Sequence, residues 1–269
     1  MKRIVFISGL PRSGTTLLAA ILRQNPGFHA GMSSPMVNMV STVQRSLSRA
    51  QEFAIDVDND TRVRVLRGLF ESFYAAMADR VVFDTNRAWT VKLALLGALF
   101  PQTKLICCVR SVNAILESFE RVFRENLLET SAMFGFDPEI NVYGRVDRLM
   151  VPGGVVGVAL NGLKEAFYGP DSERMLLVGY DRLATAPKLT LEAIYDFIGE
   201  PIFTHDFANV GFAAQDFDAA FGMNGLHTVR GTVARITRQP TLPPDLSALF
   251  HAPEFWNAPD KTSKATCLV

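Results

Sequence analysis

The sequence predicts an α/β fold in which a parallel central sheet carries helices on both faces, giving three layers. The first observation is a set of four short runs that are nearly continuous in apolar residues, as in strands covered on both faces: Arg3–Ser8, Val81–Asp84, Lys104–Arg110 and Arg174–Tyr180. The second is that helical patterns follow these runs, and such alternation is typical of parallel sheets. The third is size, because 269 residues with 48% hydrophobic content can bury a large core.

The helices are predicted from apolar spacing and end signals. After the first strand, apolar residues recur at Leu17, Leu18, Ile21 and Leu22. After the third strand, the spacing from Val112 predicts a longer amphipathic helix, with apolar positions Val112, Ile115, Leu116, Phe119, Val122 and Phe123. After the fourth strand, Thr185 and Pro187 open a helix that Gly199 closes.

The remaining segments are predicted as additions to this core. Residues 36–80 and 123–172 are expected to be helical insertions on the acceptor side of the site, the second of them irregular over 129–172 because of its glycines and prolines. The segment 200–269 is expected to be rich in loops. No repeat, low-complexity tract or linker interrupts the chain, so residues 1–269 are predicted to form a single domain.

The charge balance excludes one class of partner. The chain has 27 Lys+Arg against 27 Asp+Glu, and nucleic-acid-binding proteins usually carry a basic excess, so no nucleic acid is expected. The three cysteines form no disulfide or zinc pattern, and no apolar run is long enough for a signal peptide or a membrane span. These features predict a cytoplasmic protein; its oligomeric state is not predicted.

A phosphate-binding loop follows the first strand. Gly9-Leu10-Pro11-Arg12-Ser13-Gly14-Thr15-Thr16 has the spacing G-x-x-x-x-G-x-T between a strand and a helix. Its glycines let backbone N–H groups turn toward an anion, and the helix N-terminus adds partial positive charge. This predicts a P-loop NTPase-like domain. Thr15, however, occupies the place of the lysine that nucleoside triphosphatases use, and the cation of this loop is Arg12.

The loop resembles that of the sulfotransferases that use 3′-phosphoadenosine 5′-phosphosulfate (PAPS), whose pattern is P-[KR]-S-G-T-T-[LW]. Pro11-Arg12-Ser13-Gly14-Thr15-Thr16-Leu17 matches it completely, in the arginine form of the tyrosylprotein, carbohydrate and bacterial branches. The resemblance implies that residues Pro11 to Thr16 bind PAPS and that Arg12 stabilises charge on the leaving group. It also implies transfer of the sulfuryl group to a hydroxyl or amine, without a metal; no metal-ligand spacing occurs among the four histidines.

Further segments extend the resemblance. Arg110 ends the third strand and Ser118 follows eight residues later, as in the family's 3′-phosphate motif; Ser111 stands where the family usually has aspartate. A forked guanidinium and a hydroxyl suit a phosphate. The resemblance also implies that Tyr180 lies near the nucleotide and that Arg230-Gly231 belongs to a late cofactor loop. Alternatively, Ser118 is a solvent-facing serine and Tyr180 is purely structural.

The general base is left open, because the sequence departs from the family here. The segment Gly31-Met32-Ser33-Ser34 lacks the glutamate of the tyrosylprotein branch, and Asp84-Thr85-Asn86-Arg87 lacks the lysine and histidine of the cytosolic branch. Asp84 is the first candidate because it ends a strand on the side where open α/β sheets bind ligands, although it could equally cap the following turn. His227 and His29 are reserve candidates. Arg87 could replace the missing lysine.

Two other functions remain open. A small-molecule kinase or other P-loop NTPase would need Arg12 in place of the lysine and an acidic strand end such as Asp84 to hold magnesium. A non-catalytic nucleotide-binding protein would have kept the loop and lost the base. The acceptor is not predicted beyond a small metabolite or a carbohydrate.

Overall fold

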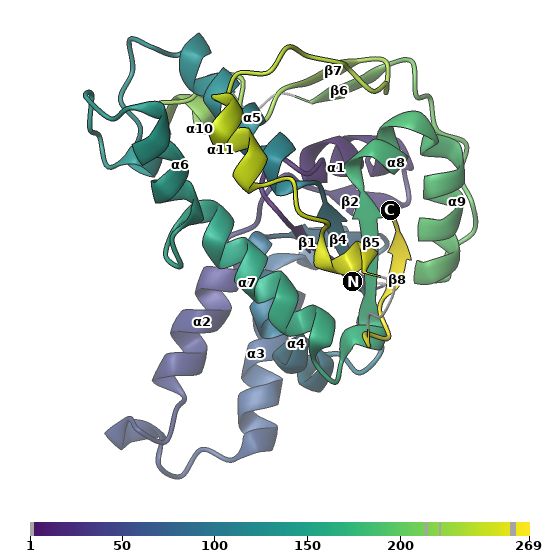
Figure 1. Ribbon diagram of the computed structural model, residues 1–269. Helices are drawn as coiled ribbons and strands as arrows, with labels where there is room; N and C mark the ends of the chain where they lie inside the picture. Colours follow the sequence, from purple (N-terminus) through teal and green to yellow (C-terminus); the bar gives the residue numbers. More distant parts are fainter. Residues whose placement is uncertain (1–2, 213–214, 221, 259–261) are drawn as a thin grey trace.

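A parallel sheet lies at the centre of this computed structural model, which describes residues 3–212, 215–220, 222–258 and 262–269 (Figure 1). Its six strands lie in the order β2-β3-β1-β4-β5-β8 and all pair in parallel. They are β1 (Arg3–Gly9), β2 (Phe28–Ala30), β3 (Val81–Thr85), β4 (Leu105–Val109), β5 (Met175–Gly179) and β8 (Thr266–Leu268). The four predicted strands are confirmed as β1, β3, β4 and β5, and the parallel sheet is confirmed with them.

The alternation of side chains along β1 separates two hydrophobic layers. Val5 and Ile7 pack on one face of the sheet, against α1 (Thr15–Leu22) and α9 (Pro187–Ile198). Ile4 and Phe6 face the other side, where Phe6 lies edge-on to Phe70 and Trp89. Both faces are therefore covered, which explains why the strands lack polar alternation.

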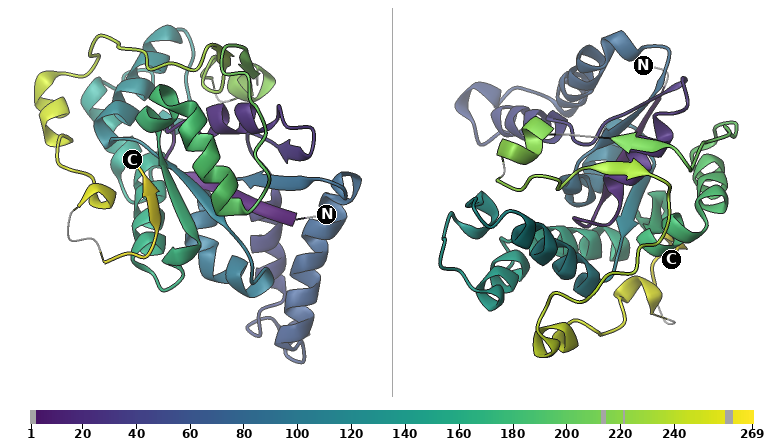
Figure 2. Two further views of the ribbon diagram at one scale, coloured as in Figure 1. Left: turned by 90° about the vertical axis from the view of Figure 1, so that its right-hand side faces the viewer. Right: turned by 90° about the horizontal axis from the view of Figure 1, so that it is seen from above.

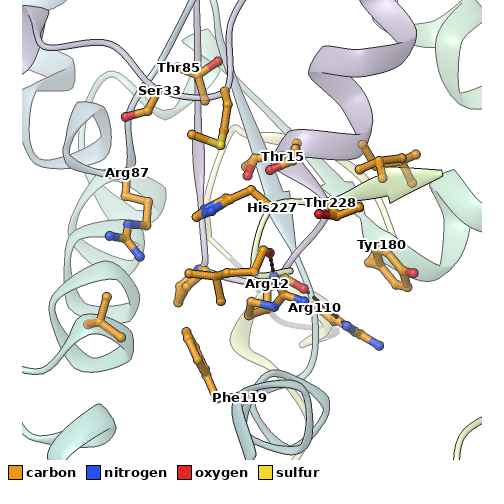
Figure 3. A pocket seen from close by; sticks show the side chains of 18 of the residues that line it. Arg12, Thr15, Ser33, Thr85, Arg87, Arg110, Phe119, Tyr180, His227 and Thr228 are labelled. Atoms are coloured by element: carbon orange, nitrogen blue, oxygen red, sulfur yellow. Dashed lines mark hydrogen bonds between the residues drawn. The ribbon is translucent and has the colours of Figure 1, made fainter. Parts of the chain in front are cut away.

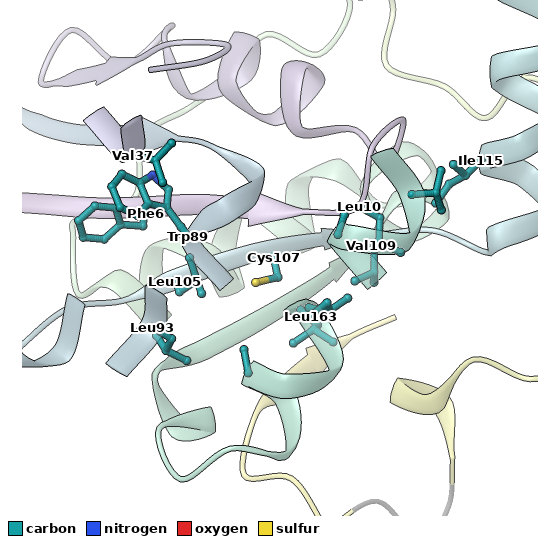
Figure 4. Packing of buried hydrophobic residues seen from close by; sticks show 14 of the residues in the cluster. Phe6, Leu10, Val37, Trp89, Leu93, Leu105, Cys107, Val109, Ile115 and Leu163 are labelled. Atoms are coloured by element: carbon teal, nitrogen blue, oxygen red, sulfur yellow. The ribbon is translucent and has the colours of Figure 1, made fainter. Parts of the chain in front are cut away.

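The second face carries most of the remaining helices. Apolar residues of these helices pack with residues of the strands in one cluster, which includes Trp89, Leu105 and Ile115 (Figure 4). The helices concerned are α2 (Met36–Ser46), α3 (Asn59–Phe73), α4 (Leu93–Leu99), α5 (Val112–Glu125), α6 (Val142–Met150) and α7 (Val155–Tyr168). The sheet and its two helical layers form the predicted three-layer architecture.

Two parts of the structure differ from the sequence-based expectation. The segment 129–172 is more regular than expected, because α6 and α7 are separated only by the turn that contains Gly153 and Gly154. Gly154 is required there, since a Cβ would lie 2.2 Å from the carbonyl oxygen of Arg148. The C-terminal segment also returns to the sheet as strand β8 beside β5, a long-range pairing that no local pattern announces.

One pair of helices and one pair of strands lie outside the central sheet (Figures 1 and 2). Helices α2 and α3 pack against each other and project from the sheet at the lower left of Figure 1. The antiparallel pair β6 (Val210–Phe212) and β7 (Val229–Gly231) lies across the top of that view and contacts α1. The β6–β7 pair therefore lies close to α1, the helix that follows the loop over 9–16.

Short helices lie between the longer elements. They are α8 (Tyr180–Thr185), α10 (Gln215–Ala220), α11 (Pro244–Leu249) and the 3₁₀ turn η3 (Arg87–Lys92). None of the helices within the described ranges has the length and apolar character needed to cross a bilayer.

Candidate active site

The loop between β1 and α1 is held in a tight, strained conformation. Gly9 has φ 126°, and a Cβ at this position would lie 2.1 Å from the carbonyl oxygen of Cys108 on β4. Arg12 has φ 60°, a left-handed conformation that costs energy for a residue with a Cβ. Gly14 has φ 95° and precedes α1 as its N-cap. The loop therefore curls back over the end of the sheet and presents the N-terminus of α1.

This loop forms the floor of a cavity of about 460 Å³ (Figure 3). The opposite wall comes from the segment 226–238, which follows α10 and includes β7. The residues that line it include Arg12, Thr15, Arg87, Arg110, Tyr180 and His227. Pro11, Gly14 and Thr16 also line this cavity, so most of the predicted loop residues face a common space.

Arg12 connects the β1–α1 loop to α5 and to the segment 226–238. Its Nε donates to the hydroxyl of Ser118 on α5 at 3.0 Å, and its guanidinium also donates to the carbonyl of Leu226. Arg110 in turn donates to the backbone carbonyl of Arg12 at 3.3 Å. Burial, followed by repulsion from Arg110, lowers the pKa of Arg12 to about 10, which still leaves it cationic at neutral pH. The cation is thus fixed and partly stripped of water.

Arg110 and Arg238 add positive charge at the same end of the cavity. The Arg110 guanidinium lies 4.2 Å from the centroid of the Tyr180 ring, a cation–π arrangement that orients it. Burial lowers the pKa of Arg110, with smaller contributions from neighbouring arginines that include Arg238. Arg238 lines the cavity, whereas the predicted Arg230 has a side chain outside the described part of the structure, and the exposed Gly231 is not among the lining residues. Sequence reasoning missed Arg238 because no motif marks it.

Two of the predicted ligand-binding hydroxyls are buried instead. Ser13 donates to the carbonyls of Leu10 and Cys108, so it braces the loop against β4. Ser118 is also buried and accepts the hydrogen bond from Arg12. Neither residue lines the cavity in this structure. The spacing between Arg110 and Ser118 does bring them to one site, but through Arg12 rather than through a shared opening.

Asp84, the first candidate for the base, does not reach the cavity. Its side chain is fully buried and accepts three hydrogen bonds: from Trp89 Nε1 at 2.8 Å, from the Tyr74 hydroxyl at 2.7 Å and from the Ser34 hydroxyl at 2.9 Å. Burial raises the pKa of Asp84, opposed by these three hydrogen bonds. Asp84 is thus a buried carboxylate that joins β3 to its neighbours. A general base must contact the acceptor, and this side chain does not line the cavity.

His227 and His29, the reserve candidates, are placed differently. His227 lines the cavity, and its Nδ1 lies 2.6 Å from Oδ1 of Asp218 on α10. Burial lowers the pKa of His227, and Asp218 acts in the opposite direction. His29 lies on β2 near the Tyr74 ring and is not part of the cavity wall. The structure therefore leaves His227 as the candidate that a bound acceptor could touch.

Thr85 and Arg87 border the cavity from the β3 side. The Thr85 hydroxyl is buried, yet no described residue forms a hydrogen bond with it. The backbone carbonyl of Arg87 accepts from Ser8 at 2.9 Å, and no ion pair to its side chain occurs within the described residues. Arg87 thus supplies a cation that a ligand can use.

A second cavity of about 610 Å³ adjoins the first. The two share Asn86, Arg87, Met133 and Val155 as lining residues. Beyond them, the second cavity lies between η3, the turn before α7, and α7 itself. Its lining is mostly apolar and includes three valines with about half of their surface exposed: Val91, Val151 and Val158. Exposed apolar surface of this kind is typical of a binding groove.

A metal centre is not visible in the arrangement of side chains. No group of three or more His, Cys, Asp or Glu residues in the described ranges is close enough together to hold a metal ion. Cys107 and Cys108 are buried in the core, where burial raises the pKa of both thiols.

Comparison with known proteins identifies the family of this chain. A sequence model of the sulfotransferase family matches residues 5–205. The protein-tyrosine sulfotransferase 2 of Gallus gallus is 26% identical over 203 residues, 73% of this chain and 51% of that protein. The nodulation protein NoeE of Sinorhizobium fredii is 32% identical over 130 residues, 44% of this chain and 31% of that protein. The chain thus spans about half or less of the length of these relatives.

Solved structures show the same fold. The sulfotransferase domain from the curacin biosynthetic pathway superposes with a TM-score of 0.52 at 20% identity and covers 76% of each chain. The sulfotransferase domain of the Synechococcus PCC 7002 olefin synthase gives a TM-score of 0.50 at 20% identity, covering 75% of this chain and 74% of that domain. Since the family match spans most of the residues and includes the loop over 9–16, this chain belongs to the sulfotransferase family.

Proposed function

We propose that this protein transfers the sulfuryl group of PAPS to a hydroxyl or amine of a small acceptor. The observation that carries the proposal is the cavity at the β1–α1 loop, which Arg12, Arg110 and Arg238 line together with the first residues of α1. The first N–H groups of a helix have no partners within the helix, so they add hydrogen-bond donors to these cations. A nucleotide with several phosphate and sulfate charges matches such a site.

The chain's own residues would divide the work as follows. The phosphosulfate of PAPS would be held at the start of α1 by Thr15, Thr16 and Arg12. A second phosphate would lie near Tyr180, where Arg110 and Arg238 can bind it. PAPS supplies a sulfuryl group whose bond from sulfur to the bridging oxygen breaks as a bond to the acceptor forms, with the electron pair leaving on the bisphosphate. Fixed cations near that oxygen stabilise the developing charge without reorganisation.

His227 is the proposed general base. It borders the donor cavity, and burial lowers its pKa, so the ring is neutral at pH 7 and able to accept a proton from the acceptor hydroxyl. This argues against the non-catalytic alternative, which rested on the absence of the family's usual bases. The alternative of a nucleoside triphosphatase is weakened by Asp84, because its buried carboxylate accepts hydrogen bonds from Trp89 and Tyr74 and does not line the cavity.

The second cavity is the proposed acceptor site. It is continuous with the donor cavity through Arg87 and Met133, and it has few polar groups apart from Asn86, Thr90 and the arginines at its ends. An acceptor with an apolar body therefore fits it better than a free sugar, which would leave many hydroxyls without partners. Arg87 lies where the two cavities meet and suits the family lysine's place beside the transferred group.

A transfer assay tests the proposal. Purified protein is incubated with ³⁵S-labelled PAPS and sets of alkanols, phenols, amines, sugars and tyrosine peptides, with either EDTA or magnesium. We expect labelled product in both buffers for at least one apolar acceptor, and loss of product in His227→Gln. Absence of label on every acceptor, together with magnesium-dependent hydrolysis of ATP, would instead identify a P-loop triphosphatase.

A further inference from the structure

A buried carboxylate lies next to the proposed base, and its charge also raises the pKa of Arg12. Asp218 lies on α10, and its side chain is 1% exposed. Its Oδ2 accepts the backbone N–H of His227 at 2.9 Å, and its Oδ1 lies 2.6 Å from the ring Nδ1 of the same residue. One carboxylate therefore contacts both the main chain and the side chain of a single histidine. Removing it from water is costly, so a structure that buries it must gain something in return.

The backbone around His227 is fixed from the other side as well. The carbonyl of Leu226, the residue before it, accepts a hydrogen bond from Arg12 in the phosphate-type loop. The peptide that carries His227 is thus held between Asp218 and Arg12. This ties the segment after α10 to the donor site and limits the positions that the imidazole can take.

We propose that Asp218 is a positioning residue that holds His227 with its proton on Nδ1, so that Nε2 carries the lone pair that receives the proton of the acceptor. This inference rests on the sulfuryl-transfer function proposed above. In the step concerned, the proton passes from the acceptor O–H to Nε2 as the acceptor oxygen bonds to sulfur, and His227 becomes an imidazolium. Asp218 then faces a positive ring and stabilises it, the arrangement that orients histidine bases in hydrolytic triads.

The charges near His227 agree with this assignment. Arg12 and Arg87 repel the imidazolium and lower the pKa of His227, in addition to the larger effect of burial. Asp218 opposes them through its hydrogen bond and its charge, both of which raise the pKa of His227. Without that charge, the pKa of His227 would fall further. Asp218 therefore keeps the base strong enough to act near neutral pH.

The test needs no acceptor. Protein labelled with ¹⁵N in its histidines is titrated by NMR, and the His227 signals are identified by their loss in His227→Gln. We expect the neutral ring of the wild-type protein to carry its proton on Nδ1. In Asp218→Asn we expect a lower His227 pKa and a loss of the tautomer preference, while His205, whose Nε2 lies 3.0 Å from the Tyr195 hydroxyl, keeps its signals as an internal control.

Either of two NMR results would overturn the inference. One is a wild-type His227 ring with its proton on Nε2, and the other is a His227 pKa and tautomer that do not change in Asp218→Asn. Where Asp218→Asn binds adenosine 3′,5′-bisphosphate as the wild-type protein does, its kcat should fall by about 10²- to 10⁴-fold, and Asp218→Glu should recover part of this loss. If the wild-type protein binds no bisphosphate, the proposed function fails, while the NMR result still decides the placement of the proton.

Discussion

Replacing Asp84 by asparagine distinguishes a structural carboxylate from a catalytic one. The change removes the charge and keeps the shape of the side chain. In the folded protein, Oδ2 accepts from both Tyr74 and Ser34, while Oδ1 accepts from Trp89. In asparagine, the remaining carbonyl oxygen can still accept from Trp89, but an NH₂ group, which only donates, replaces the charged oxygen that accepted from the two hydroxyls. Both charge-assisted bonds are then lost, and only weaker neutral bonds from the NH₂ group to the hydroxyl oxygens can replace them.

The cost can be worked from these contacts. A hydrogen bond to a charged group contributes about 1.5 to 3 kcal/mol, so two lost bonds cost about 3 to 6 kcal/mol. Burial raises the pKa of Asp84 and so already destabilises its ionised form. Removing the buried charge therefore offsets part of this loss. We therefore expect Asp84→Asn to lower the free energy of unfolding by about 2 to 4 kcal/mol and Tm by roughly 5 to 10 °C.

Urea unfolding followed by tryptophan fluorescence measures this loss, and the exposed Asp196→Asn on α9 provides a matched control that should leave stability unchanged. At a temperature where the variant is folded, kcat with PAPS should stay within a few-fold of the wild-type value. A loss of 100-fold or more in kcat with an unchanged unfolding midpoint would refute the reasoning and return Asp84 to the role of base.

Three further predictions concern the two cavities. Arg110→Gln should weaken binding of adenosine 3′,5′-bisphosphate by about 10- to 100-fold in calorimetry, since it removes a charged donor, and should change AMP binding much less. The acid limb of kcat/KM should lie below pH 6.5, because burial lowers the pKa of His227 and activity requires its neutral form; a midpoint above pH 7 would contradict this. Val158→Asp should raise KM for apolar acceptors and leave bisphosphate affinity unchanged, whereas Leu189→Asp, at an exposed apolar position on α9, should affect neither.

The sheet could be predicted from the sequence where local pattern and burial coincide. Strands covered on both faces are apolar throughout, so β1 and β4 are evident, and Gly199 with φ 68° ends α9 where a glycine was expected to. Strand β8 could not be predicted, because its three residues are extended only by pairing with β5. A pairing between distant segments leaves no periodic signal in such a short strand.

The site was predictable only in its local part. The loop over 9–16 is one continuous motif, and its glycines follow from its φ angles and from the contact with Cys108. Asp84 looked catalytic because it ends a strand, but the burial of that end depends on Tyr74 and Trp89, which other elements supply. Asp218 was missed for the same reason, since its contact with His227 forms only when α10 packs against the segment that carries this histidine.

The most direct test of the account is a calorimetric titration of the protein with adenosine 3′,5′-bisphosphate and, separately, with ATP and magnesium. The cavity at the β1–α1 loop predicts saturable binding of one bisphosphate per chain, weakened by salt and by Arg110→Gln, and far weaker binding of ATP. ATP binding that equals or exceeds that of the bisphosphate, or no response to the bisphosphate at all, would contradict it.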